Sequence, residues 1–246
     1  FIALNEAEKL RIAKIAVDQA RSRVPVIAGT GAYATRDVID LNSKMLDVGV
    51  DAVSVITPYF NGATQPELFT HYERIARATT LPVMLYTIPA KAGITLTVDT
   101  VRRLAEIPNI RGIKDSGGDF DRLLQLINLR RDDFAVFTGT DSMILWTLIA
   151  GGDGAVAATT NAVPDVVTSI WKHFQAGDIA AARRAQESLR ALRDAFALGT
   201  MPVVLKTAAQ MLGMPAGPAR SPAQPLDANA RARLEQALAV YRDASR

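Results

Sequence analysis

The chain has 246 residues, of which 49% are hydrophobic and 22% are charged, and its formal net charge is +3. A chain of this length can bury one large core, and its apolar runs, such as residues 143–150, are too short to span a bilayer. It contains no cysteine, which excludes disulfides and thiolate chemistry and makes a reducing cytoplasm the expected location.

The arginines behind the positive charge are scattered along the chain. Arg183, Arg190 and Arg193 are interleaved with Glu187 and Asp194 at helical spacing, which is typical of solvated helix faces. There is no basic cluster interleaved with aromatic side chains. The sequence therefore predicts no nucleic-acid partner, and the short apolar runs predict no membrane association.

Short apolar, β-branched runs alternate with helical patterns along the first two thirds of the chain. Each run is followed by turn residues and then by a helix, a pattern that predicts an α/β fold with a parallel sheet and helices outside it. The predicted strands cover residues 24–28, 52–56, 83–86, 110–114, 134–138 and 155–158.

The starts of several helices are marked by capping residues. A first helix is predicted over residues 5–21. Thr64 and Glu67 form a capping-box pattern with Pro66 in the first turn of the next marked helix. Asp141 is predicted to cap an apolar, buried helix over residues 143–150.

The pattern after Pro164 is wholly helical. Helices are predicted over residues 165–176, 179–198, 202–212 and 227–244. We therefore expect a barrel domain over residues 1–176 and a C-terminal helical extension over residues 177–246. A closed parallel barrel needs about eight strands. Either the sheet is open, or about 50 further residues precede Phe1 and supply two strands, and we expect the second.

Lys114 is the leading candidate for a catalytic residue, because it ends a predicted strand and precedes the turn residues Asp115 and Ser116. An ammonium group in an apolar barrel interior loses hydration, so its pKa falls and the neutral amine can attack a carbonyl. In a competing interpretation, the lysine head reaches water or pairs with a carboxylate such as Asp115.

Tyr86 ends the preceding predicted strand. Consecutive βα units usually lie side by side, so Tyr86 and Lys114 should stand about 5 Å apart, close enough for proton transfer. Gly112 shares the face of Lys114 and should leave room for the lysine stem or a ligand. A tyrosine at a strand end is otherwise commonly a packing residue with a hydrated hydroxyl.

The remaining candidate sites are weaker. Glycine-containing loops after strands, at residues 29–31, 116–118 and 139–141, can present backbone N–H groups to a small anion. His71 and His173 lie in separate helical patterns without carboxylate partners at ligand spacing, so no metal site is predicted. Neither a dinucleotide fingerprint nor a P-loop is present, so no cofactor is predicted.

Three motifs, in this order, carry a family resemblance: residues 56–61 (ITPYFN), residues 85–89 (LYTIP) with Gly93, and residues 112–116 (GIKDS) with Asp119. Together they resemble the dihydrodipicolinate synthase and N-acetylneuraminate lyase family over essentially the whole chain. The resemblance implies a (β/α)8 TIM barrel, here without its first two strands, with a C-terminal helical extension and usually a homotetramer.

The resemblance also implies a class I aldolase mechanism. Lys114 would form a Schiff base with a 2-oxo acid such as pyruvate, and Tyr86 would relay protons. Gly139 and Val156 would line the pocket near the imine. The protonated imine is an electron sink for the adjacent carbon, which suits making or breaking a carbon–carbon bond.

Three departures from the family pattern bear on the substrate. The family carries a Gly-Thr-Thr-Gly-Glu motif that would lie just before Phe1. Phe60 stands where dihydrodipicolinate synthases have a second tyrosine that reaches a neighbouring subunit. Lys91 stands where they have an arginine for the second substrate's carboxylate, which replaces a bidentate fork by a point charge.

These differences favour aldol cleavage or dehydration of a 2-keto-3-deoxy acid. The alternative is 4-hydroxy-tetrahydrodipicolinate (dihydrodipicolinate) synthase, which condenses pyruvate with aspartate semialdehyde. A more remote alternative is a sensor that binds a 2-oxo acid without turnover; the presence of both Lys114 and Tyr86 argues against it.

Overall fold

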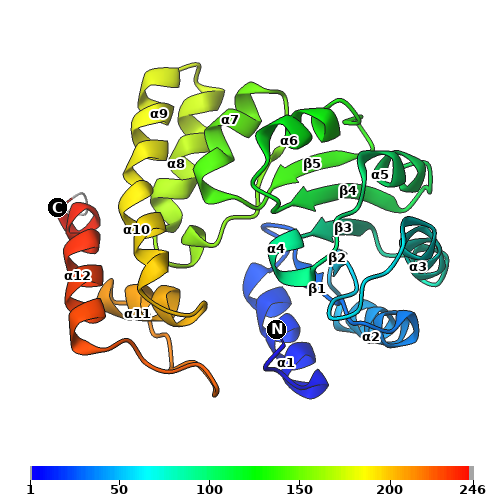
Figure 1. Cartoon of the computed structure of the whole chain (residues 1–246), viewed down its shortest axis with the longest axis horizontal. Coiled ribbons are helices and arrows are strands. Elements are labelled where there is room, and N and C mark those ends of the chain that lie inside the picture. The colour runs from blue at the N-terminus through cyan, green and yellow to red at the C-terminus, as the bar shows by residue number, and fades with distance from the viewer. Residues whose placement is uncertain (1, 244–246) are drawn as a thin grey trace. The chain divides into compact units, whose positions relative to one another are not determined.

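The computed structural model describes residues 2–243 as an α/β fold whose strands follow one another in the sheet in chain order (Figure 1). The first four strands pair in parallel. The strands are β1 (Ile27–Gly29), β2 (Ala52–Ile56), β3 (Val83–Thr87), β4 (Ile110–Asp115), β5 (Ala135–Thr138) and β6 (Gly154–Ala155).

The predicted strands are all present, with shifts at the two ends of the series. β1 begins at Ile27, because Pro25 has no N–H and Val26 N–H donates to the Asp51 carboxylate instead of a strand. β6 ends at Ala155, because the chain soon turns into a 3₁₀ helix at Thr159–Asn161.

The chain divides into two compact units, Phe1–Phe137 and Thr138–Arg246. Thr138, the last residue of β5, opens the second unit. The predicted boundary between residues 176 and 177 concerns a different division, between barrel and extension, and it stays a prediction.

Helices of the first unit flank its strands and pack against one another in chain order. The predicted capping box of Thr64 and Glu67 is confirmed at the start of α3, and Asn5, the first residue of the predicted helix 5–21, is the N-cap of α1. The helices are α1 (Glu6–Ala20), α2 (Thr35–Val48), α3 (Gln65–Arg77), α4 (Pro89–Ala92), α5 (Val98–Leu104) and α6 (Phe120–Ile127).

The second unit is mainly helical and has its own apolar core, in which Ile144, Ile170, Leu192, Val204 and Leu238 are buried together. Its elements are α7 (Ile144–Ile149), α8 (Pro164–Gln175), α9 (Ile179–Ser188), α10 (Arg190–Ala195), α11 (Val203–Met211) and α12 (Ala228–Asp243), with 3₁₀ helices at Asp141–Met143, Thr159–Asn161 and Phe196–Leu198. Residue 244, the predicted end of the last helix, lies outside the described residues.

Two helix predictions in this unit are wrong in detail. The predicted helix 179–198 is broken at Leu189, whose N–H bonds to the carbonyl of Gln186, three residues back. Asp141 does not cap α7. Its carboxylate instead accepts the backbone N–H of Thr159 at 2.6 Å, and a 3₁₀ turn leads into the helix.

Gly112 is needed for close approach of two strands. A Cβ at this position would stand 2.5 Å from the carbonyl oxygen of Ala135 on β5, which no real contact allows. The expectation that Gly112 leaves room for the lysine stem is therefore corrected: the space next to it is filled by the neighbouring backbone.

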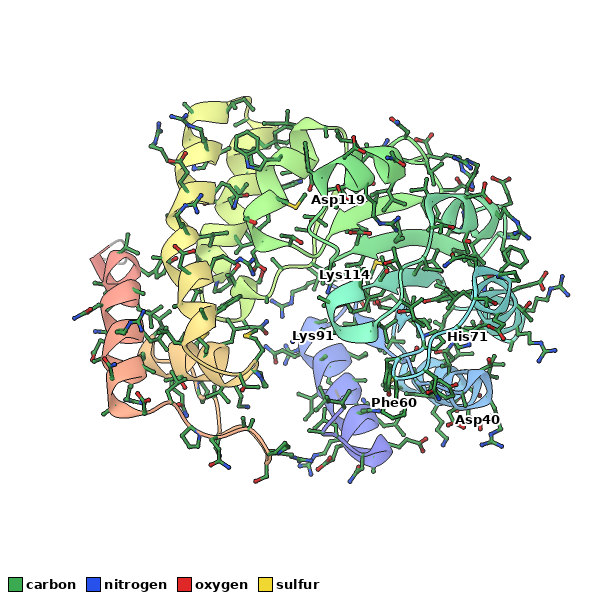
Figure 2. The ribbon with its side chains drawn as sticks, in the orientation of Figure 1. Asp40, Phe60, His71, Lys91, Lys114 and Asp119 are labelled. Atoms are coloured by element: carbon green, nitrogen blue, oxygen red, sulfur yellow. The ribbon has the colours of Figure 1, made fainter. Side chains whose placement is uncertain are left out.

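His71 on α3 is buried, with only 6% of its surface exposed (Figure 2). Its Nδ1 lies 2.8 Å from the hydroxyl of Thr35, and its ring meets Tyr72 edge-on. Burial lowers the pKa of His71 from 6.5 to about 4, so the ring is neutral near pH 7. His71 is therefore a packing residue.

We expect His71 to make the fold less stable in mild acid. Between pH 6.5 and about 4 the unfolded chain takes up a proton that the folded chain excludes, so stability is lost as the pH falls. From pH 7 to pH 5 this loss should be about 2 kcal/mol. Urea denaturation at the two pH values should show a smaller loss for His71→Gln, which cannot titrate. Equal losses for the two proteins would contradict a buried neutral His71.

Candidate active site

The parallel register of β3 and β4 brings the two leading candidates together. Tyr86 pairs with Lys114 across the strands, and the lysine Nζ lies 4.2 Å from the centroid of the tyrosine ring. Both side chains are half-buried. The predicted neighbourhood of Tyr86 and Lys114 is confirmed, and an amine and a phenol thus share one small space at the carboxyl ends of the strands.

The environment of Tyr86 keeps its phenol protonated. Burial raises the pKa of Tyr86, and a hydrogen bond with the side chain of Ser116 partly offsets this. Ser116 is held in place by its own N–H, which donates to the carbonyl of Thr87 at 2.9 Å. The sequence analysis did not single out the hydroxyl of Ser116, although its position two residues after Lys114 was a usable signal.

A buried ion pair follows Lys114 directly. Asp115 is 2% exposed, and its carboxylate accepts from Arg122 Nε at 3.0 Å and from the N–H of Gly117 at 2.8 Å. Arg122 also donates to the carbonyl of Leu96 at 2.5 Å. This pair ties the end of β4 to α6 and to the segment before α5. The competing interpretation pairs Lys114 with a carboxylate such as Asp115. In the structure, the Asp115 carboxylate forms an ion pair with Arg122.

Lys91 and Phe60 lie on loops that follow strands in the same unit (Figure 2). Lys91 is exposed on the short helix α4, directly after β3. Phe60 lies after β2, is 95% exposed and has a φ of 84°, in the left-handed region that phenylalanine rarely adopts. The structure brings Lys114 and Tyr86 together at the ends of β3 and β4.

Gly139 and Val156 lie in the second unit. Gly139 follows β5, and the N–H of Val156 donates to the carbonyl of Thr138, the residue before Gly139, at 2.9 Å. The two predicted pocket residues are thus close to one another in this unit.

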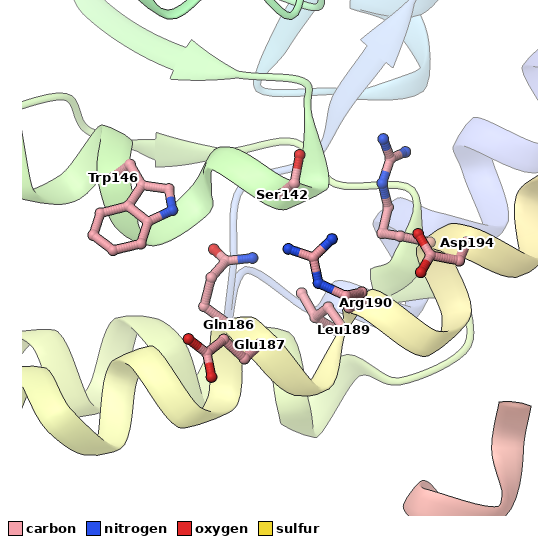
Figure 3. A pocket seen from close by; sticks show the side chains of 8 residues that line it. Ser142, Trp146, Gln186, Glu187, Leu189, Arg190 and Asp194 are labelled. Atoms are coloured by element: carbon pink, nitrogen blue, oxygen red, sulfur yellow. The ribbon is translucent and has the colours of Figure 1, made fainter.

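A network of buried polar groups adjoins them. The Arg193 guanidinium lies 3.6 Å from the Asp141 carboxylate, and Gln186 donates to the Asp141 carbonyl while accepting from the N–H of Leu145. A groove of about 250 Å³ opens beside this network. Figure 3 shows the side chains that line it. It is lined by Ser142, Trp146, Gln186, Glu187, Leu189, Arg190, Arg193 and Asp194.

No group of three or more histidine, cysteine or acidic side chains that could hold a metal ion occurs in the described part of the chain. Within residues 2–243, no helix is both long and apolar enough to cross a membrane. The ends of β3 and β4 present the amine of Lys114 and the protonated phenol of Tyr86, with the hydroxyl of Ser116 beside them.

Sequence comparisons point to one family. The profile of the dihydrodipicolinate synthetase family matches residues 1–240. The chain is 36% identical over 235 residues to 4-hydroxy-tetrahydrodipicolinate synthase 1 of Halalkalibacterium halodurans, covering 96% of this chain and 80% of that protein. It is 39% identical over 219 residues to the 4-hydroxy-tetrahydrodipicolinate synthase of Desulforudis audaxviator, covering 89% and 74%.

Solved structures agree with the sequence comparisons. A dihydrodipicolinate synthase from Bacillus anthracis is 37% identical with a TM-score of 0.92, covering 96% of this chain and 81% of that one. A prophage protein of E. coli K12 from the dihydrodipicolinic acid synthase family, in complex with pyruvate, is 34% identical with a TM-score of 0.92, covering 97% and 82%.

Proposed function

Because the chain belongs to the dihydrodipicolinate synthetase family, whose members are class I aldolase-type enzymes, we propose that Lys114 forms a Schiff base with pyruvate or a related 2-oxo acid. The observation that carries the proposal is the 4.2 Å approach of Lys114 Nζ to the ring of Tyr86. The pyruvate complex of the E. coli prophage protein supports the choice of 2-oxo acid.

The proposed reaction begins with attack of the neutral Lys114 amine on the keto carbon. The new C–N bond gives a carbinolamine, which loses its hydroxyl group as water after protonation and becomes an imine. Tyr86 is placed to supply that proton, because burial keeps its phenol protonated. The protonated imine then accepts electron density from the adjacent carbon, whose bond to a second carbon can form or break.

Lys114→Ala should abolish covalent capture of pyruvate. Borohydride reduces an imine to a stable secondary amine, so the wild-type chain treated with pyruvate and borohydride should gain the mass of one reduced pyruvate adduct. The variant should gain none, because it lacks the amine to which the proposal assigns the attack. Lys172→Ala, which removes an exposed lysine on α8, is the matched control and should keep the adduct. An adduct on Lys114→Ala would refute the assignment.

Tyr86→Phe should slow imine formation by roughly 10² to 10⁴, the usual effect of losing an acid–base group. The substitution keeps the ring that packs against Lys114 and removes only the hydroxyl. Single-turnover trapping of the imine at saturating pyruvate measures this step separately from binding. A rate equal to that of the wild type would remove Tyr86 from the mechanism.

The names of the curated relatives favour one second substrate. They are called 4-hydroxy-tetrahydrodipicolinate synthases at 36–39% identity. We therefore propose first that the enzyme condenses pyruvate with aspartate semialdehyde. In this reaction Lys91 would bind the carboxylate of the aldehyde substrate through its ammonium group.

A second candidate rests on two residues. Lys91 offers a point charge in place of a guanidinium fork, and Phe60 has no hydroxyl to transfer a proton. Both differences favour aldol cleavage or dehydration of a 2-keto-3-deoxy acid, which our sequence analysis prefers. All of these reactions share the Lys114 imine: condensation and aldol cleavage form or break a C–C bond at the adjacent carbon, whereas dehydration removes a proton from that carbon and expels hydroxide, released as water, from the next.

Steady-state kcat/KM for both reactions should separate the candidates. If condensation is the physiological reaction, its kcat/KM should reach about 10⁴ M⁻¹s⁻¹ or more. Lys91→Ala should then lower it by roughly 10-fold to 100-fold, the loss of one charged hydrogen bond, while leaving the pyruvate adduct intact. Activity confined to a 2-keto-3-deoxy acid would select the second candidate.

We also make proposals about the complete fold and the oligomeric state of the enzyme. We propose that the described strands belong to a (β/α)8 barrel with a C-terminal helical extension; the TM-score of 0.92 to the dihydrodipicolinate synthase from Bacillus anthracis supports a shared fold. Gly139 and Val156 would line the pocket near the imine. A homotetramer is proposed as the working form, and the exposed Phe60 is consistent with a surface that a second copy covers. The cytoplasmic location stays a prediction.

A further inference from the structure

The residue that follows Lys114 presents an electrostatic difficulty. Asp115 is a buried carboxylate, and a nearby negative charge favours the protonated form of a lysine. Only the neutral amine can attack a carbonyl. A lysine chosen as a nucleophile would therefore be expected to lose reactivity beside an uncompensated Asp115.

Arg122 compensates this charge from the first turn of α6. Its Nε lies 3.0 Å from the Asp115 carboxylate, and its side chain is only 15% exposed. Further bonds fix the arrangement: Arg122 donates to Leu96, and its own N–H donates to the N-cap carboxylate of Asp119 at 3.1 Å. The guanidinium is thus held by groups that have no part in the proposed chemistry.

The register shows that Arg122 acts from the other side of the sheet. Tyr86 pairs with Lys114, and the next pair is Thr87 with Asp115. Because successive side chains of a strand point to opposite faces, Asp115 and its partner lie on the face away from Lys114. The Arg122 guanidinium binds the Asp115 carboxylate and the carbonyl of Leu96, so the influence that we assign to it passes through Asp115.

We propose that Arg122 is a positioning residue that keeps Lys114 reactive by neutralising Asp115. The inference rests on the proposed function of Lys114. It adds that Arg122 influences the protonation of the Lys114 amine. It predicts that the charge balance of the Asp115–Arg122 pair, more than its contribution to folding, sets the pH at which the imine forms.

The other groups that flank β4 in the first unit are few. β3 brings Tyr86, whose phenol is neutral near pH 7, and the neighbouring stretch of β5 in this unit, residues 135–137, has no titratable side chain. From α6, Asp119 caps the helix and Asp121 accepts from Gln125. α5 adds two arginines, one paired with Asp99 and one over the ring of Phe69.

Three variants test the proposal. For each, the yield of borohydride-trapped pyruvate adduct is measured against pH, and the pH at half of the maximal yield is the midpoint. Asp115→Asn keeps the shape and the acceptor for Gly117 but leaves the cation, so the midpoint should fall by about one pH unit. Arg122→Gln leaves the carboxylate, so the midpoint should rise by about one pH unit. The double variant removes both charges and should return the midpoint to the wild-type value.

Opposite shifts that cancel in the double variant would be expected only from charge. If the pair merely fixes the turn after Lys114, adduct yield falls and the midpoint stays where it is, which would overturn the proposal. Should Arg122→Gln fail to fold, Asp115→Asn and the double variant still decide between these outcomes. Arg131→Gln, which removes an exposed arginine paired with Glu106, is the matched control and should leave the midpoint unchanged.

Failure of this proposal is distinguishable from failure of the proposed function. If wild-type protein traps no pyruvate, or Lys114→Ala traps as much, the function itself is wrong. If trapping depends on Lys114 and the midpoints do not move, only the role of Arg122 is wrong.

Discussion

The pairing of β3 with β4 in one register is the constraint on which the candidate site depends. Because side chains alternate across a strand, a slip of one residue would send Lys114 to the helix-facing side and bring Asp115 to the face of Tyr86. The register is held by burial of Val83, Leu85 and Ile113, each fully buried. The approach of β4 to β5 that Gly112 allows adds to this. The chemistry at the strand ends thus depends on apolar packing deeper in the sheet.

Buried carboxylates at the ends of strands serve the structure in both units. Asp115 is satisfied by Arg122 and a backbone N–H, and Asp141 by the N–H of Thr159 with Arg193 nearby. Each acid would be costly to bury alone, and each is retained with a cation and a backbone donor. In the proposed function, the amine of Lys114 and the phenol of Tyr86 carry the chemistry on β3 and β4.

Local patterns were enough to predict the strands and the Tyr86–Lys114 pair. Alternating βα units impose chain-order neighbours, so the end of one strand meets the end of the next without knowledge of the tertiary structure. Thr64 and Glu67 were equally predictable, because a capping box is complete within four residues.

Errors arose where a residue's partner lies far along the chain. Asp141 has the sequence context of a helix cap, but its carboxylate accepts the backbone N–H of Thr159, 18 residues later. From the sequence, Gly112 is expected to leave room for the Lys114 side chain on β4. The contact that requires glycine comes instead from the backbone of Ala135 on β5. Arg122 gave no signal in sequence, since a helix arginine becomes meaningful only when the turn folds it onto Asp115.

In the proposed function, Phe60 is relevant to binding of the second substrate and not to formation of the imine. A phenylalanine with a φ of 84° carries a backbone strain of about 1 kcal/mol or more, and it also exposes a large apolar surface. Neither feature helps a strand to pair or Lys114 to react. Residues of β3 and β4 are held by the core, whereas Phe60 and Lys91 lie on connecting segments after β2 and β3, where sequence varies more readily. In the proposed function these segments would choose the second substrate, and the strands beneath them would serve either proposed reaction.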